Sequence, residues 1–266
     1  TVVVTTLSGM CFSAPMSAAF AGLGVAAAAT VWGLTRNGKM TSAILFFCLM
    51  EALQAVQYAV LADDLDDARC RTAANRGLTV LGYVHIQFQP YFTNLYFQSF
   101  RPATGKALPG EETTWRVVGR LCLAQCALGL WRLVLSPGMG VDGVPADLTP
   151  WYDRSRDWLE GRKLCSYRGS LHLAWSLPLA QPTYFVPGLG LHCFMMFAPI
   201  LAIGGIRELD GCAFLFVSGP LLATWLTANR HEAASIWCFF STLQCALGAI
   251  SALVQSSRSS KTRKEA

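Results

Sequence analysis

Charged side chains are scarce in this sequence. Only 14% of the 266 residues are Asp, Glu, Lys or Arg, whereas an ordinary soluble domain carries about 25%. A soluble domain of this length needs a charged shell around its core, but here the charges fall between long apolar runs. The scarcity of charge therefore excludes an ordinary soluble globular protein and indicates that lipid surrounds much of the chain.

The signature motifs of common enzyme classes are also missing. The sequence contains no GxSxG nucleophile elbow, P-loop, GxGxxG turn or HExxH helix. It has no CxxC pair typical of a structural zinc site, because Cys122 and Cys126 are four residues apart within one apolar run. These absences favour a non-catalytic role, although a membrane enzyme whose ligands come from separate helices is not excluded.

Cysteine, in contrast, is present ten times. Seven of the cysteines lie within or at the edge of apolar runs, where cysteine behaves as a small hydrophobic residue: Cys48, Cys122, Cys126, Cys193, Cys212, Cys238 and Cys245. Cys11, Cys70 and Cys165 lie in extramembrane or interfacial segments. A disulfide between two of these three is therefore open, as is the alternative of free thiols.

The apolar runs predict an all-α, polytopic integral membrane helix bundle with about seven transmembrane helices. The predicted spans cover about residues 14–34, 40–62, 77–100, 117–136, 184–206, 212–228 and 233–254. A further apolar run, Leu171 to Leu179, is too short to cross, because nine residues of helix reach roughly 14 Å against a hydrocarbon core of about 30 Å. We expect it to form an interfacial or re-entrant segment whose ends lie on one side.

The sequence is organised as one transmembrane domain, residues 1–254, and a basic polar tail, residues 255–266. The tail lacks interleaved aromatic residues and follows no basic fold, so we predict contact with anionic headgroups and not with nucleic acid. On the side of the membrane that holds the N-terminus, the segments outside the predicted spans carry nine Lys and Arg residues, and on the side that holds the C-terminus they carry ten. This near balance does not decide the orientation of the chain in the membrane. The basic tail favours a C-terminus on the cytoplasmic or stromal side.

Two features of the spans have structural explanations. Ala18, Gly22 and Ala26 repeat every four residues in the first span, which predicts a face for close helix packing. Arg120 and Arg132 lie near the two ends of the fourth span, where long basic side chains reach the interface.

The second span carries a carboxyl group at mid-membrane. Glu51, Gln54 and Tyr58 are spaced by three and four residues, so they lie on one helical face. A carboxyl group at this depth is costly and indicates a function. The alternative is that Glu51 is protonated or paired and only fixes the packing.

The third span is unusually polar. Gln87, Tyr91, Asn94 and Gln98 form a stripe at helical spacing, which should face protein, water or a ligand instead of lipid. Pro90, directly after Gln89, removes an amide donor in the middle of the span and predicts a kink.

Each of the four histidines lies near other polar or aromatic residues: His85, His172, His192 and His231. Histidine ligates metal ions, haem iron or the magnesium of chlorophyll, and it relays protons. His85 and His192 are the strongest candidates because their spans are deepest. The alternative for each is a hydrogen-bonded structural histidine.

Asn229 and Glu232 open the last span. Glu232 follows Asn229 by three residues and can satisfy free amides at a helix start, as in a capping arrangement. This structural role competes with a place for Glu232 in a functional site.

Several short motifs together resemble one family. They are Met10-Cys11-Phe12-Ser13, Glu51-x-x-Gln54, His85-x-x-Phe88-Gln89-Pro90 with Asn94, Cys165 with His172-Leu173-x-Trp175, and Glu232 with Trp237-Cys238. With these motifs the chain resembles an uncharacterised group of seven-helix membrane proteins that begin Met-Cys-Trp-Ser or similar. The resemblance covers most of the chain and implies the fold, with Met10 at the usual start and residues 1–9 as an extension. It implies no function.

Three hypotheses follow. The first is a non-catalytic subunit of a larger membrane assembly in an organelle, such as a photosynthetic complex of the thylakoid or a respiratory complex of the mitochondrial inner membrane. Its partners are the lipid bilayer and other membrane subunits, and its ligand is a chlorophyll, a haem or a metal ion. The cofactor-binding candidates are His85, His192, Glu51, Gln54, Gln89, Asn94, His172 and Glu232.

The second hypothesis is a membrane-embedded metal or redox enzyme, and the third is a transporter or receptor-like protein whose polar stripe lines a cavity. Because buried charge is costly, we also expect Glu51, His85 and at least one of His192 and Glu232 to face a common interior site.

Overall fold

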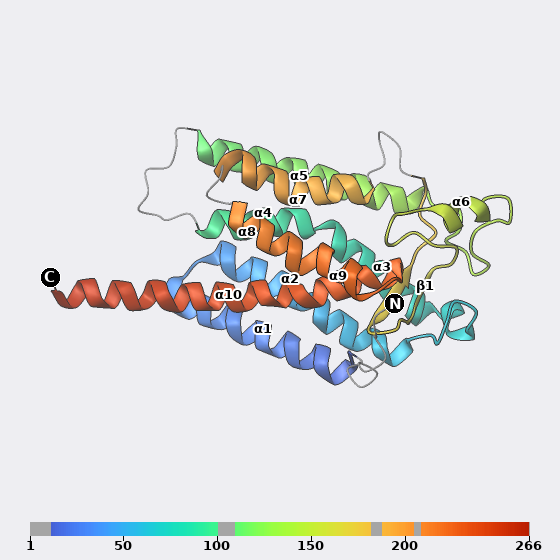
Figure 1. The fold of residues 1–266 in the computed structure, drawn as a ribbon, viewed down its shortest axis with the longest axis horizontal. Coiled ribbons are helices and arrows are strands. Elements are labelled where there is room, and N and C mark those ends of the chain that lie inside the picture. The colour runs from blue at the N-terminus through green and yellow to red at the C-terminus, as the bar shows by residue number, and fades with distance from the viewer. Residues whose placement is uncertain (1–11, 101–109, 182–187, 205–208, 266) are drawn as a thin grey trace.

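The computed structural model describes residues 12–100, 110–181, 188–204 and 209–265. These residues form a helical bundle with a loop-rich cap at one end (Figure 1). The helices are α1 (Ala14–Thr35), α2 (Gly38–Gln57), α3 (Ala73–Gln87), α4 (Gln89–Phe100), α5 (Glu111–Val134), α6 (Thr149–Arg154), α7 (Leu189–Gly204), α8 (Leu209–Phe216), α9 (Leu222–Leu226) and α10 (Arg230–Glu265). The strands are β1 (Cys165–Arg168) and β2 (Leu173–Ser176).

Five helical stretches are long and apolar enough to cross a membrane: Ala14–Thr35, Gly38–Val60, Glu111–Val134, Leu209–Leu226 and Arg230–Val254. Their outer faces carry large apolar side chains, among them Leu23 and Trp32 on α1 and Leu121 on α5. A soluble surface does not tolerate so extensive an apolar exposure, whereas lipid does. The structure thus supports a helical membrane protein, with five candidate spans where the sequence predicts seven.

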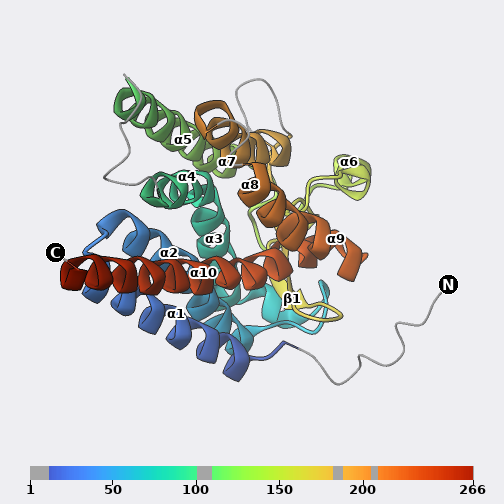
Figure 2. The ribbon, with the colours of Figure 1, turned by 60° about the vertical axis from the view of Figure 1, so that its left-hand side comes forward.

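The other two predicted spans are shorter or interrupted in the structure. The third is split into α3 and α4, and the fifth, α7, has an apolar stretch only over Leu189–Ile203. The predicted start of the fifth span, residues 184–187, lies outside the described residues. At Phe88, between α3 and α4, the backbone N–H turns back to the carbonyls of His85 and Ile86. The interruption that Pro90 predicts is therefore present, and α4 continues in a different direction (Figure 2).

Helix α1 packs against α2 and α10, but not through the face that the sequence predicts. Ala18, Gly22 and Ala26 are exposed, so that prediction is wrong. The buried face carries Ser17 and Gly24 instead. A side chain at Gly24 would place its Cβ 1.7 Å from the Cys48 Sγ of α2, so glycine is what allows this approach.

The cap consists of residues 58–72 and 135–181. In it β1 and β2 pair antiparallel, with Cys165 opposite Ser176. The run Leu171 to Leu179 therefore contains a strand, so the predicted short helix is wrong. The run becomes a strand because β1 offers it a pairing partner. The fold is mainly helical, with one two-stranded sheet among the described residues, and not all-α. A disulfide joins Cys70 to Cys165, so two of the three cysteines outside the predicted spans are paired. The third, Cys11, lies outside the described residues.

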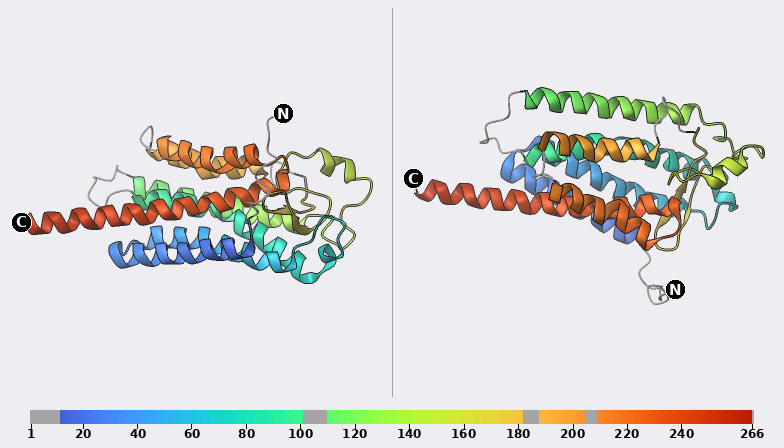
Figure 3. Two further views of the ribbon diagram at one scale, coloured as in Figure 1. Left: turned by 60° about the horizontal axis from the view of Figure 1, so that its bottom comes forward. Right: turned by 45° about the horizontal axis from the view of Figure 1, so that its top comes forward.

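The cap and the chain's C-terminus lie at opposite ends of the bundle. Helix α10 begins at the cap and extends beyond the other helices at the far end (Figure 3). The backbone of the basic tail, residues 255–266, therefore continues α10 as helix as far as Glu265.

Candidate functional site in the bundle interior

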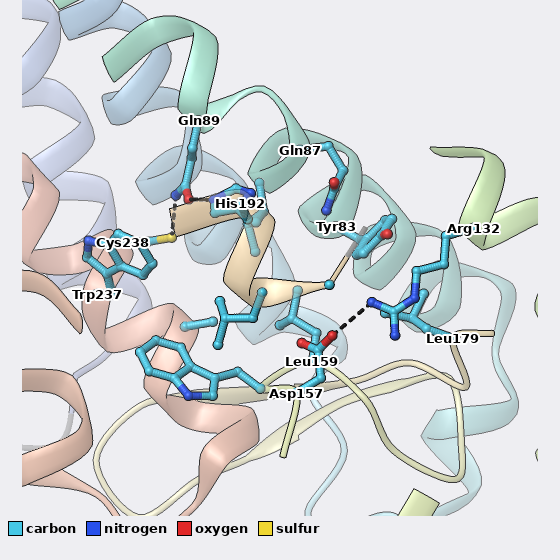
Figure 4. Close-up of a pocket in the computed structure, with 15 residues that line it drawn as sticks. Tyr83, Gln87, Gln89, Arg132, Asp157, Leu159, Leu179, His192, Trp237 and Cys238 are labelled. Carbon is cyan, nitrogen blue, oxygen red and sulfur yellow. Dashed lines mark hydrogen bonds and ion pairs between the residues drawn. The ribbon is translucent and has the colours of Figure 1, made fainter. Parts of the chain in front are cut away.

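A small cavity of about 40 Å³ lies in the bundle interior, next to the cap. Its polar lining comes from Tyr83 and Gln87 of α3, Gln89 of α4, Arg132 of α5, Asp157 of the cap, His192 of α7 and Cys238 of α10 (Figure 4). The cavity therefore joins five helices and the cap in one place. The interruption between α3 and α4 positions it, because Gln89 is the first residue after the break.

The side chain of Gln89 holds the helices together at this point. Its Oε1 lies 3.2 Å from Nε2 of His192, and its Nε2 donates to the Cys238 Sγ over 3.3 Å. All three side chains are buried. Nδ1 of His192 has no hydrogen-bond partner among the described residues, so this nitrogen is available to a water molecule or a ligand.

Glu51 extends this polar group into α2. Its carboxyl lies within electrostatic range of the Cys238 thiol and next to the Ser17 hydroxyl of α1. Neither Glu51 oxygen makes a well-aligned hydrogen bond within the described chain, and the same holds for both polar atoms of Gln54. Both side chains are fully buried. A polar path thus runs from Cys238 through Gln89 to His192, and Glu51 lies near its Cys238 end, with no hydrogen bond to it in the described chain.

The wall of the cavity toward the cap is charged. Arg132 donates to Asp157 over 2.8 Å and to Glu160 over 2.9 Å, and its Nε donates to the Ala180 carbonyl over 2.7 Å. Ser155 also hydrogen-bonds Glu160. Only 3% of the Arg132 side chain is exposed. The expected snorkelling of Arg132 is therefore wrong: it binds two carboxylates in the interior, whereas Arg120 is exposed.

Glu160 is the titratable member of this group in the cap. Burial raises its pKa to about 7, while the hydrogen bond from Ser155 and the charge of Arg132 act in the opposite direction. Two carboxylates share one guanidinium here, so a proton on Glu160 makes the group neutral. This is a second place, after His192, at which a proton could be held near the cavity.

His85 and His172 lie elsewhere. His85 stacks on Phe46 of α2, with ring centroids 4.0 Å apart, and does not line the cavity. His172 lies in the cap, where its Nδ1 accepts from the Leu173 N–H over 2.8 Å and lies 3.1 Å from the Tyr58 hydroxyl. Burial lowers the pKa of His172 to about 3, so it stays neutral. Nε2 of His85 and Nε2 of His172 have no hydrogen-bond partner in the described chain, as is the case for Nδ1 of His192.

Glu232 has a structural environment. Its carboxylate accepts from the backbone N–H groups of Leu171 and His172 over 2.6 and 2.5 Å, and from the hydroxyls of Ser170 and Thr227. Glu232 therefore closes the turn between β1 and β2. The predicted capping of the α10 start by the Glu232 side chain is therefore wrong: the carboxylate binds the β1–β2 turn and Thr227, while Asn229 Oδ1 accepts from the His231 N–H at the helix start.

Asn94 does not line the cavity. Its Nδ2 donates to the Met195 carbonyl of α7 over 2.8 Å, and its Oδ1 has no partner in the described residues. With Gln98 it lines a separate groove between α4 and α5. The polar stripe of the third span thus faces protein and a groove, as predicted.

The shared site expected for Glu51, His85 and either His192 or Glu232 is not what these contacts show. No hydrogen bond between described residues joins two of these four residues directly. Gln89 hydrogen-bonds both His192 and Cys238, and Glu51 lies near Cys238. Nor are three or more His, Cys, Asp or Glu side chains of the described residues placed to hold a metal ion.

The size of the cavity limits its ligands. A volume of about 40 Å³ accommodates a few water molecules, because one molecule needs roughly 10–15 Å³. Ligation of a pigment or haem by His192 stays a prediction. Sequence reasoning missed Arg132 and Cys238 as members of the site, since both matched common residues of an apolar span.

Comparisons with known proteins identify the family but no function. No curated protein and no solved structure matches the chain. A family model described as a family of unknown function, DUF5765, matches residues 15–259. The match covers most of the sequence and agrees with the uncharacterised family that the short motifs indicate. The chain therefore belongs to the family of unknown function DUF5765.

Proposed function

We propose that this protein is a transporter-like seven-helix membrane protein that binds a small polar solute in the bundle interior. The observation that carries the proposal is the cavity beside the α3–α4 interruption, with free hydrogen-bonding capacity at His192. Buried polar atoms without partners cost about 1–3 kcal/mol each. Their concentration along this path is best explained by water or a solute that occupies the interior.

The seven crossings of the proposal are α1, α2, α3 with α4, α5, α7, α8 with α9, and α10. Each of these runs between the cap and the opposite end of the bundle (Figure 1). Irregular backbone within a membrane is tolerated where it lines a cavity or is covered by protein. The break at Phe88 meets this condition, since Gln87 and Gln89 on either side of it line the cavity.

A second irregular helix lies close by. Between α8 and α9, residues Val217–Leu221 form a π-helical turn that contains Pro220. Its Gly219 packs on Trp237, a residue of the cavity wall: a Cβ at Gly219 would lie 2.4 Å from the indole Nε1. Interrupted helices around a mid-membrane site are typical of secondary transporters. In the conformation described, the cavity is closed to anything larger than a few waters, so a solute requires these helices to move.

The lining indicates the class of solute. Arg132 and Asp157 neutralise each other in the wall, and the other polar groups include two amides, a phenol, an imidazole and a thiol. A neutral or zwitterionic molecule with several hydrogen-bonding groups fits this lining better than a strong anion or cation.

The disulfide supports an orientation. Disulfides persist in oxidising compartments, so the Cys70–Cys165 bond favours a cap on the extracytoplasmic side. The C-terminus then lies on the cytoplasmic side, in agreement with its basic residues. An organellar location and the assembly-subunit and redox-enzyme hypotheses stay predictions.

Two measurements test the interior site. Cys238 lines the cavity, whereas Cys245 on the same helix does not. Because labelling requires the same helix movement as solute entry, we expect methanethiosulfonate ethylammonium to label Cys238 faster than Cys245 in the native protein, as read by mass spectrometry. Equal protection of both thiols would contradict a water-accessible interior.

The second measurement is a thermal-shift screen with glycine, serine, glycerol and urea. At least one solute should raise the Tm of the wild-type protein and not that of Gln89→Leu. Gln57→Leu is the matched control, because Gln57 is a buried glutamine that bonds only Trp175 and the Leu78 carbonyl in the described chain. If every solute acts alike on all three proteins, the site does not bind them.

A further inference from the structure

A groove of about 310 Å³ lies between α4 and α5, near the end of the bundle opposite the cap. Tyr91, Asn94 and Gln98 of α4 form one wall, and Trp115 and Gly119 of α5 form the other. A Cβ at Gly119 would lie 3.5 Å from the Tyr91 ring, in ordinary van der Waals contact, so α4 and α5 lie close together here. The groove is separate from the interior cavity and shares no lining residue with it.

The mouth of the groove is positively charged. Lys39, Arg116 and Arg120 line it together with a single carboxylate, Glu112, and all four residues are exposed. Within the described residues, no carboxylate forms an ion pair with any of the three cations. Most other basic residues that form ion pairs in the described chain lie in the cap. The described residues therefore leave an excess of positive charge at the groove.

The floor of the groove offers a buried hydrogen-bond acceptor. Asn94 is only 3% exposed, and its Nδ2 is occupied by the carbonyls of Pro90 and Met195. Its Oδ1 has no partner in the described chain. A buried acceptor of this kind requires an explanation, and a hydroxyl or amine donor of a bound molecule supplies one.

The position of the cations along α5 corresponds to the edge of a membrane. Arg116 and Arg120 follow the helix start at Glu111 by five and nine residues, which is roughly 8 and 14 Å along the axis. Basic side chains at this depth reach toward the headgroup layer. The outer surface of α5 also carries three exposed apolar side chains, which lie between the two arginines and further along the helix: Val117, Leu121 and Leu123.

We propose that the groove between α4 and α5 binds an anionic glycerophospholipid. Its phosphate lies against Arg116, Arg120 and Lys39, a donor of its glycerol or headgroup reaches Asn94 Oδ1, and its acyl chains cover Leu121 and Leu123. Arginine suits this contact because its guanidinium bonds phosphate oxygens in pairs. The site rests on the membrane location of the chain but not on the solute-binding role of the interior cavity.

Native mass spectrometry of the purified protein tests this site. The protein is mixed with equal amounts of phosphatidylglycerol and phosphatidylcholine that carry the same acyl chains, and the ratio of the two bound lipids is measured. We expect phosphatidylglycerol to be preferred, and the preference to fall about tenfold or more in Arg116→Gln/Arg120→Gln, because each basic residue near the headgroups contributes to anionic-lipid attraction. Lys39→Gln alone should lower it less.

The control removes the same charge elsewhere. Arg71→Gln/Arg168→Gln changes two exposed arginines of the cap and should leave the ratio unchanged. A preference that survives in Arg116→Gln/Arg120→Gln, or that falls equally in the cap variant, would overturn the proposal. So would competition by inorganic phosphate or glycerol 3-phosphate at matched concentration, because the site would then serve a soluble phosphate.

Discussion

The cap and the bundle interior differ in how fully their buried polar groups are hydrogen-bonded within the described chain, although His172 Nε2 and Ser176 Oγ of the cap also lack partners. At the edge of the cap, Asn75 of α3 bonds the carbonyls of Val60 and Ser166, and its Oδ1 accepts from the Ser166 N–H. Glu232, which reaches into the cap, accepts four hydrogen bonds. In the bundle, both oxygens of Glu51 and both polar atoms of Gln54 lack partners in the described chain.

This difference separates structural from functional polarity. A buried polar group that the protein satisfies stabilises the fold, whereas one that it leaves unsatisfied lowers stability unless water or a ligand binds. The hydrogen-bonded groups of the cap therefore hold the helix ends in place. The unsatisfied groups of the interior lower the stability of the fold, as is expected of a binding site without its ligand.

The largest expected effect concerns the boundary between the two regions. Arg132→Met leaves Asp157 and Glu160 as buried carboxylates without their cation. Loss of one partner of a buried ion pair typically costs about 3–5 kcal/mol. For a chain of this size we expect Tm to fall by roughly 6–20 °C.

Thermal unfolding in detergent measures this effect, with Arg120→Met on the exposed face of the same helix as the control. Neutralising both acids together with the arginine, in Arg132→Met/Asp157→Asn/Glu160→Gln, should restore part of the loss. An unchanged Tm in Arg132→Met would show that the triad does not brace the cap.

The next effect is that of the disulfide. It links Cys70 and Cys165 across 95 residues of sequence, and removal of such a link typically costs about 2–4 kcal/mol. Cys70→Ala/Cys165→Ala should lower the Tm accordingly and make it insensitive to dithiothreitol. Cys193→Ala, which removes a half-buried free thiol, should leave the response to dithiothreitol intact. A wild-type Tm that dithiothreitol does not lower would contradict a stabilising link.

A smaller effect is the pH dependence of Glu160. Its folded pKa of about 7 lies above the ordinary value of 4.5, so the folded state retains a proton that the unfolded chain has released. The stability contributed by this proton is complete below about pH 4.5, decreases progressively as the pH rises, and is lost by about pH 7. His172, with its folded pKa lowered to about 3, acts in the opposite direction below about pH 6.5 and does not interfere above it.

We therefore expect the wild-type Tm, measured relative to that of Glu160→Gln so that the His172 contribution common to both cancels, to fall from about pH 4.5 to about pH 7 and to level off above it. Glu160→Gln is the reference because it keeps an acceptor for Arg132 and Ser155 but does not titrate. Parallel curves for the two proteins would show that Glu160 does not titrate in this range.

Much of the fold could be predicted from the sequence because the membrane imposes it. The apolar runs around residues 14–34 and 117–136 correspond closely to α1 and α5, and Pro90 predicts the interruption between α3 and α4. The strand at Leu173–Ser176 could not be predicted, because its unbroken apolar pattern fits a short helix as well as a buried strand. Its pairing with β1 decides between them.

The site was less predictable than the fold. His192 and Gln89 could be chosen because polar groups are rare in apolar runs. Arg132 was misjudged, since its carboxylate partners come from the cap, 25 and 28 residues further along the chain, and no helical spacing connects them. Glu232 was placed in a possible interior site because the turn that it closes is visible only after β1 and β2 are paired.

The most direct test of the account compares two buried carboxyl groups in one experiment. Glu51→Gln and Glu232→Gln make the same change at fully buried positions, and Tm is measured for both in detergent without added solute. Glu232→Gln should be destabilised, by about 1.5–3 kcal/mol, because it loses charge-assisted hydrogen bonds to backbone amides. Glu51→Gln should be unchanged or more stable, because no aligned donor in the described chain depends on its charge. Equal destabilisation of the two variants would contradict the division between a structural cap and a functional interior.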